Sequence, residues 1–273
     1  MPVIPYSTTI HVRDTCLCLH AQRAARALAR RFDMALKPTG LTNQQFSLMM
    51  ALNRPEPPPM GPVARLLAMD RTTLTRNLSL ALAQQDRWDE SAAHAAVALV
   101  QNPAHESIRA QFTLAAEKSG HVPAPLAAFI APGFFHQVVL VTSPARWQLG
   151  LIVSCVIAAG AVGGLLAGAY LRSSRRTLAL AWSVLGLGVC TAITSLGCWL
   201  NYGPATDARA AIIWRAGTLR SIPTEADTAQ KTTPLAAGSL AQIDKSFLGW
   251  RHLRFDAGQS GWVRTEDLVP IWR

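Results

Sequence analysis

The side chains that perform catalysis or hold metals in proteins are few in this sequence and do not gather. Asp89 and Glu90 are neighbouring carboxylates, but their position indicates the solvated first turn of a helix rather than an acid–base pair. Cys16 and Cys18 stand too close together to form a zinc site without a second pair, and the other three cysteines lie in apolar stretches. We therefore expect no enzymatic activity, no metal and no cofactor.

The residues after Asp70 suggest a different chemistry, the recognition of DNA. They predict a polar helix, and threonine and arginine at the start of such a helix can contact base edges and phosphates. The candidate DNA-contacting residues are Arg71, Thr72, Thr73, Thr75 and Arg76.

Three predicted helices precede this polar helix and would position it. The first covers residues 15–36 with an apolar stripe, and the second covers 42–52 with a capping box of Thr42 and Gln45 at its start. A proline-rich break at 55–59 separates them from a third helix at 60–68. A short helix, a turn and a capped polar helix are typical of a helix-turn-helix.

Residues 15–78 resemble a MarR-type winged-helix regulator. The resemblance rests on CLCLHAQRAARALARRFD, GLTNQQFSLMMAL and VARLLAMDRTTLTRNL, and it implies a transcription regulator that places its polar helix in the major groove. The wing and the dimerisation helices of such a regulator do not follow. The segment is therefore truncated, and its specific affinity for DNA should be lower by orders of magnitude.

Residues 77–119 resemble one tetratricopeptide (TPR) unit, a helix pair of about 34 residues. Ser79 and Ser91 replace small residues of that family where its two helices cross, Ala95 replaces a bulky aromatic residue, and Pro103 closes the unit. A second unit begins at His105 but lacks its second helix. The alternative interpretation is a generic amphipathic helical hairpin. Residues 120–147, rich in proline and apolar residues, would form a linker to the next segment.

Two uncharged apolar runs, at 148–171 and 177–200, predict a transmembrane hairpin, because each is long enough to cross the hydrocarbon core. The alternative is a pair of buried core helices. Gly160, Gly164 and Gly168 would line one face and let the second helix approach closely, or they simply reflect a run rich in glycine and alanine. These glycines follow no predicted strand, so they do not form a nucleotide-binding loop.

The charge distribution predicts the topology of this hairpin. The net charge of +10 is dispersed, with +5 over residues 1–147 and +2 over 201–273, so no segment is a strongly basic surface. Arg172, Arg175 and Arg176 form the joint between the two runs and should face the cytoplasm. Trp147, Trp199 and Tyr202 would then share the outer interface. No apolar run typical of a signal peptide begins the sequence.

Residues 207–273 predict a small β-barrel of short strands at 210–214, 239–243, 250–255 and 261–263, separated by turn residues. The segment is similar to a bacterial SH3 domain, with the matching features LRS before Pro223, then Trp250 and the final GWV at 261–263. This resemblance implies binding of peptides or wall components. Trp250 and Trp262 are the candidate ligand-binding residues, although packing in the core is the interpretation we favour for both.

The expected fold is therefore mainly α with a small C-terminal β-barrel: a helix-turn-helix segment, a TPR-like helix pair, a two-helix transmembrane hairpin and a bacterial SH3-like domain. The order of parts over residues 77–273 resembles the TPR/SH3 membrane proteins of bacterial aerotolerance (Bat) operons. That resemblance implies a scaffold in the inner membrane, with its TPR-like and SH3-like parts in the periplasm and with protein partners besides the lipid bilayer.

Two alternatives remain for the whole chain. In the first, it is a membrane-tethered MarR-type regulator that binds DNA, which requires the N-terminal residues in the cytoplasm. In the second, the chain is a fusion of the two families near residue 77, where the sequence TRNL fits both. Topology separates the scaffold from the regulator, because the scaffold requires residues 1–147 outside the cytoplasm.

Overall fold

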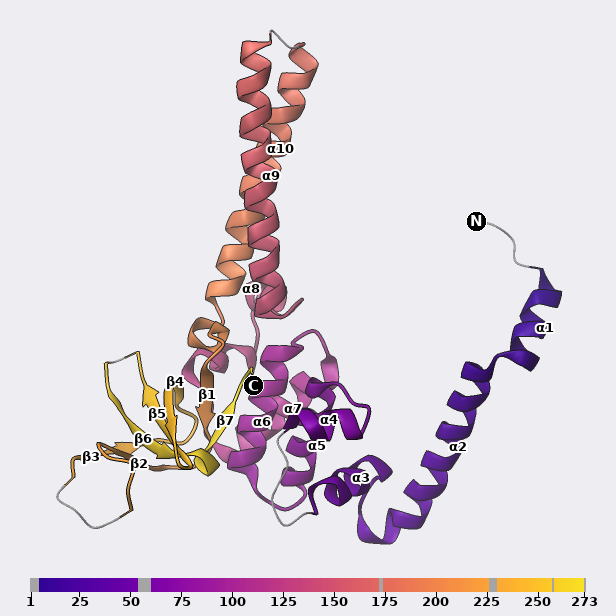
Figure 1. The fold of residues 1–273 in the computed structure, drawn as a ribbon, viewed down its shortest axis with the longest axis vertical. Coiled ribbons are helices and arrows are strands. Elements are labelled where there is room, and N and C mark those ends of the chain that lie inside the picture. The colour runs from indigo at the N-terminus through magenta and orange to yellow at the C-terminus, as the bar shows by residue number, and fades with distance from the viewer. Residues whose placement is uncertain (1–4, 54–59, 172–173, 226–229, 257, 273) are drawn as a thin grey trace. The chain divides into compact units, whose positions relative to one another are not determined.

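The computed structural model describes residues 5–53, 60–171, 174–225, 230–256 and 258–272, which form two compact units, 1–71 and 72–273 (Figure 1). The described chain is mainly helical, with one antiparallel sheet near its C-terminus. The predicted proline-rich break at 55–59 and Arg172 of the arginine joint lie outside the described residues.

The first unit consists of helices, and the prediction from apolar periodicity is confirmed for its main elements. They are α1 (Tyr6–Thr15), α2 (Leu17–Leu36), the short 3₁₀ helix η1 (Lys37–Thr39), α3 (Asn43–Leu52) and α4 (Met60–Leu66). The capping box is present: the Thr42 hydroxyl accepts a hydrogen bond from the backbone N–H of Gln45, whose side chain accepts one from the Thr42 N–H. The expected helix at 15–36 is present as α2, which begins after Cys16, whose backbone is extended; α1 before it was not predicted.

The second unit begins with three helices and continues through shorter elements into the hairpin. These are α5 (Arg71–Ala83), α6 (Trp88–Gln101), α7 (Glu106–Ser119), η2 (Ala124–Phe129) and α8 (Phe134–Val139), followed by α9 (Pro144–Tyr170) and α10 (Arg175–Leu200). After the hairpin come η3 (Gly203–Thr206) and the sheet. The segment at 120–147, expected to be a linker, instead supplies the buried side chains of Leu126, Phe129 and Val139.

α6 is buried on every side from Ser91 to Val100, which is unusual for a helix near the surface of a small unit. One side of α6 packs on α7 and another on β1 (Ala210–Ile213) and β7 (Leu268–Pro270). The side chain of Gln101 donates a hydrogen bond of 2.6 Å to the backbone carbonyl of Ile271. The helical pair and the sheet therefore share one hydrophobic core.

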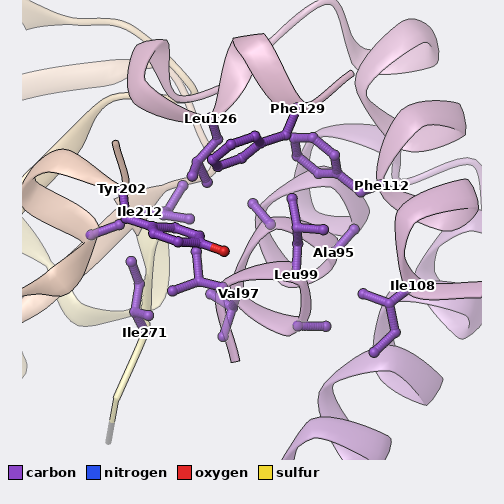
Figure 2. Close-up of a cluster of buried hydrophobic side chains, with 14 of the residues drawn as sticks. Ala95, Val97, Leu99, Ile108, Phe112, Leu126, Phe129, Tyr202, Ile212 and Ile271 are labelled. Atoms are coloured by element: carbon purple, nitrogen blue, oxygen red, sulfur yellow. The ribbon is translucent and has the colours of Figure 1, made fainter. Parts of the chain in front are cut away.

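Figure 2 shows this core, with Leu99 of α6, Phe112 of α7 and Ile271 after β7 among its members. Tyr202, directly after α10, lies fully buried in it, and its ring packs on Phe129 with centroids 5.2 Å apart. The expectation that Tyr202 lies in an interfacial belt is wrong, because its hydroxyl donates to the carbonyls of Val139 and Thr142 inside the protein.

α9 and α10 lie side by side and antiparallel (Figure 1), and their contact face follows a seven-residue period. Apart from Pro144 in its first turn, the buried positions on α9 are Ser154, Ala161 and Gly168, which is the spacing of a left-handed helix pair. The two helices approach one another closely at Gly188, where a Cβ would lie 3.3 Å from the backbone nitrogen of Ala158.

Of the three glycines predicted to line one face of α9, only some belong to this contact face. Gly168 is buried, as expected, but a Cβ on Gly160 or Gly164 would meet no atom within 4 Å. Residues four apart shift gradually around a helix, whereas residues seven apart stay on the contact face, which we call the seam. Only one of the three glycines therefore lies on the seam.

The sheet has seven antiparallel strands in the order β3-β2-β6-β5-β4-β1-β7. The predicted C-terminal β-structure is thus confirmed, but the predicted barrel is wrong, because the edge strands β3 and β7 do not pair and the sheet is not closed. β4 (Leu240–Phe247), β5 (Trp250–Arg254) and β6 (Ser260–Arg264) form a meander at the positions expected from the sequence. The prediction missed β2 (Gly217–Arg220), β3 (Thr232–Leu235) and β7 because each is three or four residues long, too short for an alternating pattern to emerge.

Gly261, the first residue of the GWV sequence at 261–263, has a clear packing role. A Cβ on Gly261 would lie 2.6 Å from the Leu219 Cγ and 2.8 Å from the carbonyl oxygen of Arg220. β6 and β2 can therefore approach one another only because residue 261 has no side chain.

Candidate functional site

The five candidate DNA-contacting residues occupy the first turns of α5, where the side chains of three of them are buried or bonded within the unit. Thr72 donates a hydrogen bond of 3.2 Å to the Oε1 of Gln101, and the Nη1 of Arg76 donates one of 2.9 Å to Ser107. Thr75 is only 2% exposed. Arg71 and Thr73 are half-buried. This side of α5 thus faces α6 and α7.

The crossing of α5 and α6 contains the two serines expected at this position. Both are fully buried, and each hydroxyl donates to the other residue's backbone carbonyl, Ser79 to Ser91 at 2.9 Å and Ser91 to Ser79 at 2.8 Å. Gln111 of α7 donates a further bond of 3.3 Å to the Ser79 hydroxyl. Small hydroxyl side chains therefore join three helices at their closest approach, where a larger side chain would hold them apart.

α6 also contains a buried titratable side chain, His94. Burial, assisted by the positive charge of Arg87, lowers the pKa of His94 to about 4, so the ring is neutral at pH 7. Among the described residues its Nδ1 has no hydrogen-bond partner. Glu90, one turn earlier, forms an ion pair with Arg87, and burial raises the pKa of its carboxyl.

The two candidate tryptophans lie on the same face of the sheet. Trp250 pairs with Arg264 across β5 and β6, while Trp262 pairs with His252 on one side and with Arg220 of β2 on the other. Directly paired residues and residues two apart share a face, so these five side chains lie together. Leu253 and Val263 alternate with them and belong to the core on the other face.

Trp250 has an environment suited to binding. It is 7% exposed, and two guanidinium groups lie over its ring, Arg264 at 4.9 Å and Arg220 at 5.8 Å from the centroid. Trp262 instead makes an edge-to-face contact with His252 at a centroid distance of 5.1 Å. The two tryptophans that the sequence could not distinguish thus have different surroundings.

A cavity of about 300 Å³ opens beside Trp250. Leu235 and Val263 contribute apolar surface to it, and charged side chains of both signs surround it. Those charged side chains are Arg215, Arg220, Arg264, Glu225, Glu266 and Asp267. We refer to this cavity and its lining as the Trp250 pocket. Its volume is at the lower end of the range for small-ligand sites in proteins.

Two of the pocket arginines are held by the loop that follows β2. Glu225 accepts hydrogen bonds from the Nε and Nη2 of Arg264, and this carboxylate raises the pKa of the guanidinium. The Nη1 of Arg220 donates a bond of 2.7 Å to the carbonyl oxygen of Thr224. The arrangement can therefore hold a carboxylate over an aromatic floor.

The sequence did not identify the arginines of the Trp250 pocket. A usable signal existed in β6, where SGWVR alternates between the faces and places Arg264 on the same side as Trp262. The pairing of Arg220 with Trp262 depends on β2, which was not predicted.

The described residues contain no group of three or more His, Cys, Asp and Glu side chains able to hold a metal ion. The five cysteines are free thiols.

Comparison with known proteins leaves the chain without a family assignment: no protein-family model, curated protein or solved structure matches it.

Proposed function

We propose that this protein is a non-enzymatic scaffold of the bacterial inner membrane, anchored by a two-pass hairpin and carrying a TPR-like helix pair and an SH3-like domain on one side of the membrane. This is the arrangement of the aerotolerance-operon membrane proteins that its sequence resembles. Its partners are the lipid bilayer and other proteins.

The observation that carries the proposal is the core shared by the segments on either side of the hairpin. Leu99 of α6 precedes α9, and Ile271 follows α10, yet both belong to one hydrophobic cluster. Two segments that pack together must lie on the same side of a membrane, which supports a hairpin that crosses it twice rather than once. The apolar windows of α9 and α10 are only 11% and 6% buried, as expected of helices that face lipid rather than a protein core.

The contacts of α5 favour the TPR-like interpretation over the regulator. A recognition helix needs its polar residues free to enter the major groove. Thr72, Thr75 and Arg76 instead face α6 and α7, and the crossing of Ser79 with Ser91 is where a TPR unit has small residues.

Reporter fusions after Arg273 test the topology. Alkaline phosphatase should be active there and a cytoplasm-dependent fluorescent protein should be dark, because the arginine joint is expected inside. The reverse pattern would place the soluble part in the cytoplasm and favour the membrane-tethered regulator. Gel shifts with the full chain in micelles then separate the two further, because a regulator binds one sequence in preference to others at fixed salt.

A further inference from the structure

The charges around the Trp250 pocket are not fully paired. Arg264 is paired with Glu225, and Asp267 lies close enough to Arg215 for that guanidinium to lower its pKa against the larger effect of burial. Among the described residues, Arg220 has no carboxylate partner and bonds only to the Thr224 carbonyl. The half-buried guanidinium of Arg220 thus has no ion-pair partner among the residues that the structure describes.

The ion pair of Arg264 indicates which anion fits the pocket. Glu225 is an exposed side chain of the same chain, and its carboxylate binds Arg264, whose guanidinium lies over the Trp250 ring. One guanidinium that lines the pocket is therefore already bound to a carboxylate. Three carboxylates at the rim, of Glu225, Glu266 and Asp267, would repel a doubly charged phosphate more strongly than a singly charged group.

The apolar part of the pocket indicates what the carboxylate is attached to. The indole of Trp250 offers apolar surface beside the arginines, and Leu235 and Val263, which belong to the core of the sheet, border the cavity. A small aliphatic side chain adjacent to a carboxylate would contact this surface while its charge reaches Arg220.

We propose that the Trp250 pocket binds a carboxylate of a peptide, with Arg220 as its main partner and Trp250 as its floor. Glu225 occupies part of the pocket in the absence of that ligand and competes with it for Arg264. The proposal rests on the proposed binding role of the SH3-like domain and specifies the chemistry of its ligand.

The test uses the full chain in nanodiscs, labelled with 5-fluorotryptophan, so that each of its 8 tryptophans gives a fluorine resonance. The Trp250→Phe variant assigns the resonance of interest. The probes are acetyl-Ala-Ala with a free carboxylate, the same dipeptide as its amide, acetyl-Ala-Glu-amide, and inorganic phosphate.

The free carboxylate of acetyl-Ala-Ala or the side chain of acetyl-Ala-Glu-amide should shift the Trp250 resonance saturably, and their comparison tells which source of carboxylate is preferred. The amide and phosphate should not shift it. Arg220→Gln should weaken binding by about tenfold or more, because a charge-assisted hydrogen bond is lost. Arg209→Gln removes the same charge on an exposed residue outside the pocket and should leave binding unchanged.

Glu225→Gln separates a competitor from a structural residue. Removal of the competing carboxylate should tighten binding of the probes several-fold, whereas a purely structural Glu225 would leave binding equal or weaker. Equal shifts with acid and amide, binding of phosphate alone, or equal effects of Arg220→Gln and Arg209→Gln would overturn the proposal. These outcomes are independent of the reporter fusions, which test the scaffold and its topology without any ligand.

Discussion

At the scale of single residues, the buried side chain of His94 in α6 makes the stability of the second unit depend on pH. Its ring lies in a helix buried on all sides, and no described residue bonds its Nδ1. The charged form of a histidine is costly in such a place, and the nearby Arg87 adds repulsion. The residue therefore remains neutral in the folded protein over a wide range of pH.

This leads to a prediction for stability against pH. The pKa of His94 is lowered from 6.5 to about 4, so between these values the unfolded chain binds more protons than the folded chain. Above about pH 6.5, His94 is neutral in both states and does not lower the free energy of unfolding. That free energy should fall by about 3 kcal/mol as the pH drops to 4. Near-UV circular dichroism during chemical unfolding in micelles measures this loss.

Variants identify the group responsible for this pH dependence. His94→Leu should remove most of the difference between pH 7 and pH 4.5, because the substituted side chain cannot be protonated. His121→Gln, at an exposed position, should retain it. If both variants lose stability with acid as the wild type does, another group is responsible, and the burial of His94 does not control the response.

At the scale of elements, the α9–α10 hairpin depends on the seven-residue seam and not on the glycine stripe. Its close approach lies at Gly188, where a side chain would meet the backbone of Ala158, and at Gly150, where a Cβ would lie 3.2 Å from the Ser195 hydroxyl. In a membrane, where lipid is as apolar as the helices, such close packing is the main source of helix association.

A matched pair of substitutions tests the seam. Gly188→Leu should separate the two helices, while Gly160→Leu, at a position open to its surroundings, should leave them packed. The distance between spin labels at the exposed positions Leu166 and Leu180 reports the change in chains without native cysteines. A longer and broader distance distribution is expected for Gly188→Leu only, and equal distributions for both variants would contradict the seam.

How well the elements could be predicted depended on their length and periodicity. The long helices and the strands of the β4–β6 meander follow from clear patterns, and so does the capping box at Thr42. η2 and α8 were missed because they are six residues each and rich in proline or aromatic residues. The candidate pocket could be predicted only in part, since Trp250 was named but its arginines depend on strand pairing between segments distant in sequence.

At the scale of the whole molecule, the second unit joins the two helices that are long and apolar enough to span a membrane directly to its core. Tyr202 directly follows α10 and is buried in the shared core, and the Nε1 of Trp147 at the start of α9 donates a bond of 3.0 Å to the Val139 carbonyl. Both ends of the hairpin are therefore fixed to the same body. A rotation of either helix would therefore displace side chains of that core.

The positions of the cysteines allow a test of sidedness that does not involve the hairpin's packing. Cys16 and Cys18 precede the spans, whereas Cys155, Cys190 and Cys198 lie within α9 and α10. A membrane-impermeant maleimide added to intact spheroplasts should modify the first pair alone, since lipid would cover Cys155 and Cys190 and the protein core covers Cys198. Replacement of Cys16 and Cys18 by serine should abolish the labelling, and labelling that requires permeabilised membranes would show that the N-terminal unit is cytoplasmic.

The bond from Gln101 to the Ile271 carbonyl spans 170 positions of the sequence, and this has a consequence for biosynthesis. When α6 leaves the ribosome, the strands that cover one of its sides have not yet been made. The two long apolar helices are synthesised next, and β7 emerges only afterwards. Throughout that interval the side of α6 that β1 and β7 later cover is an exposed apolar surface, and such surfaces make a nascent chain prone to aggregation.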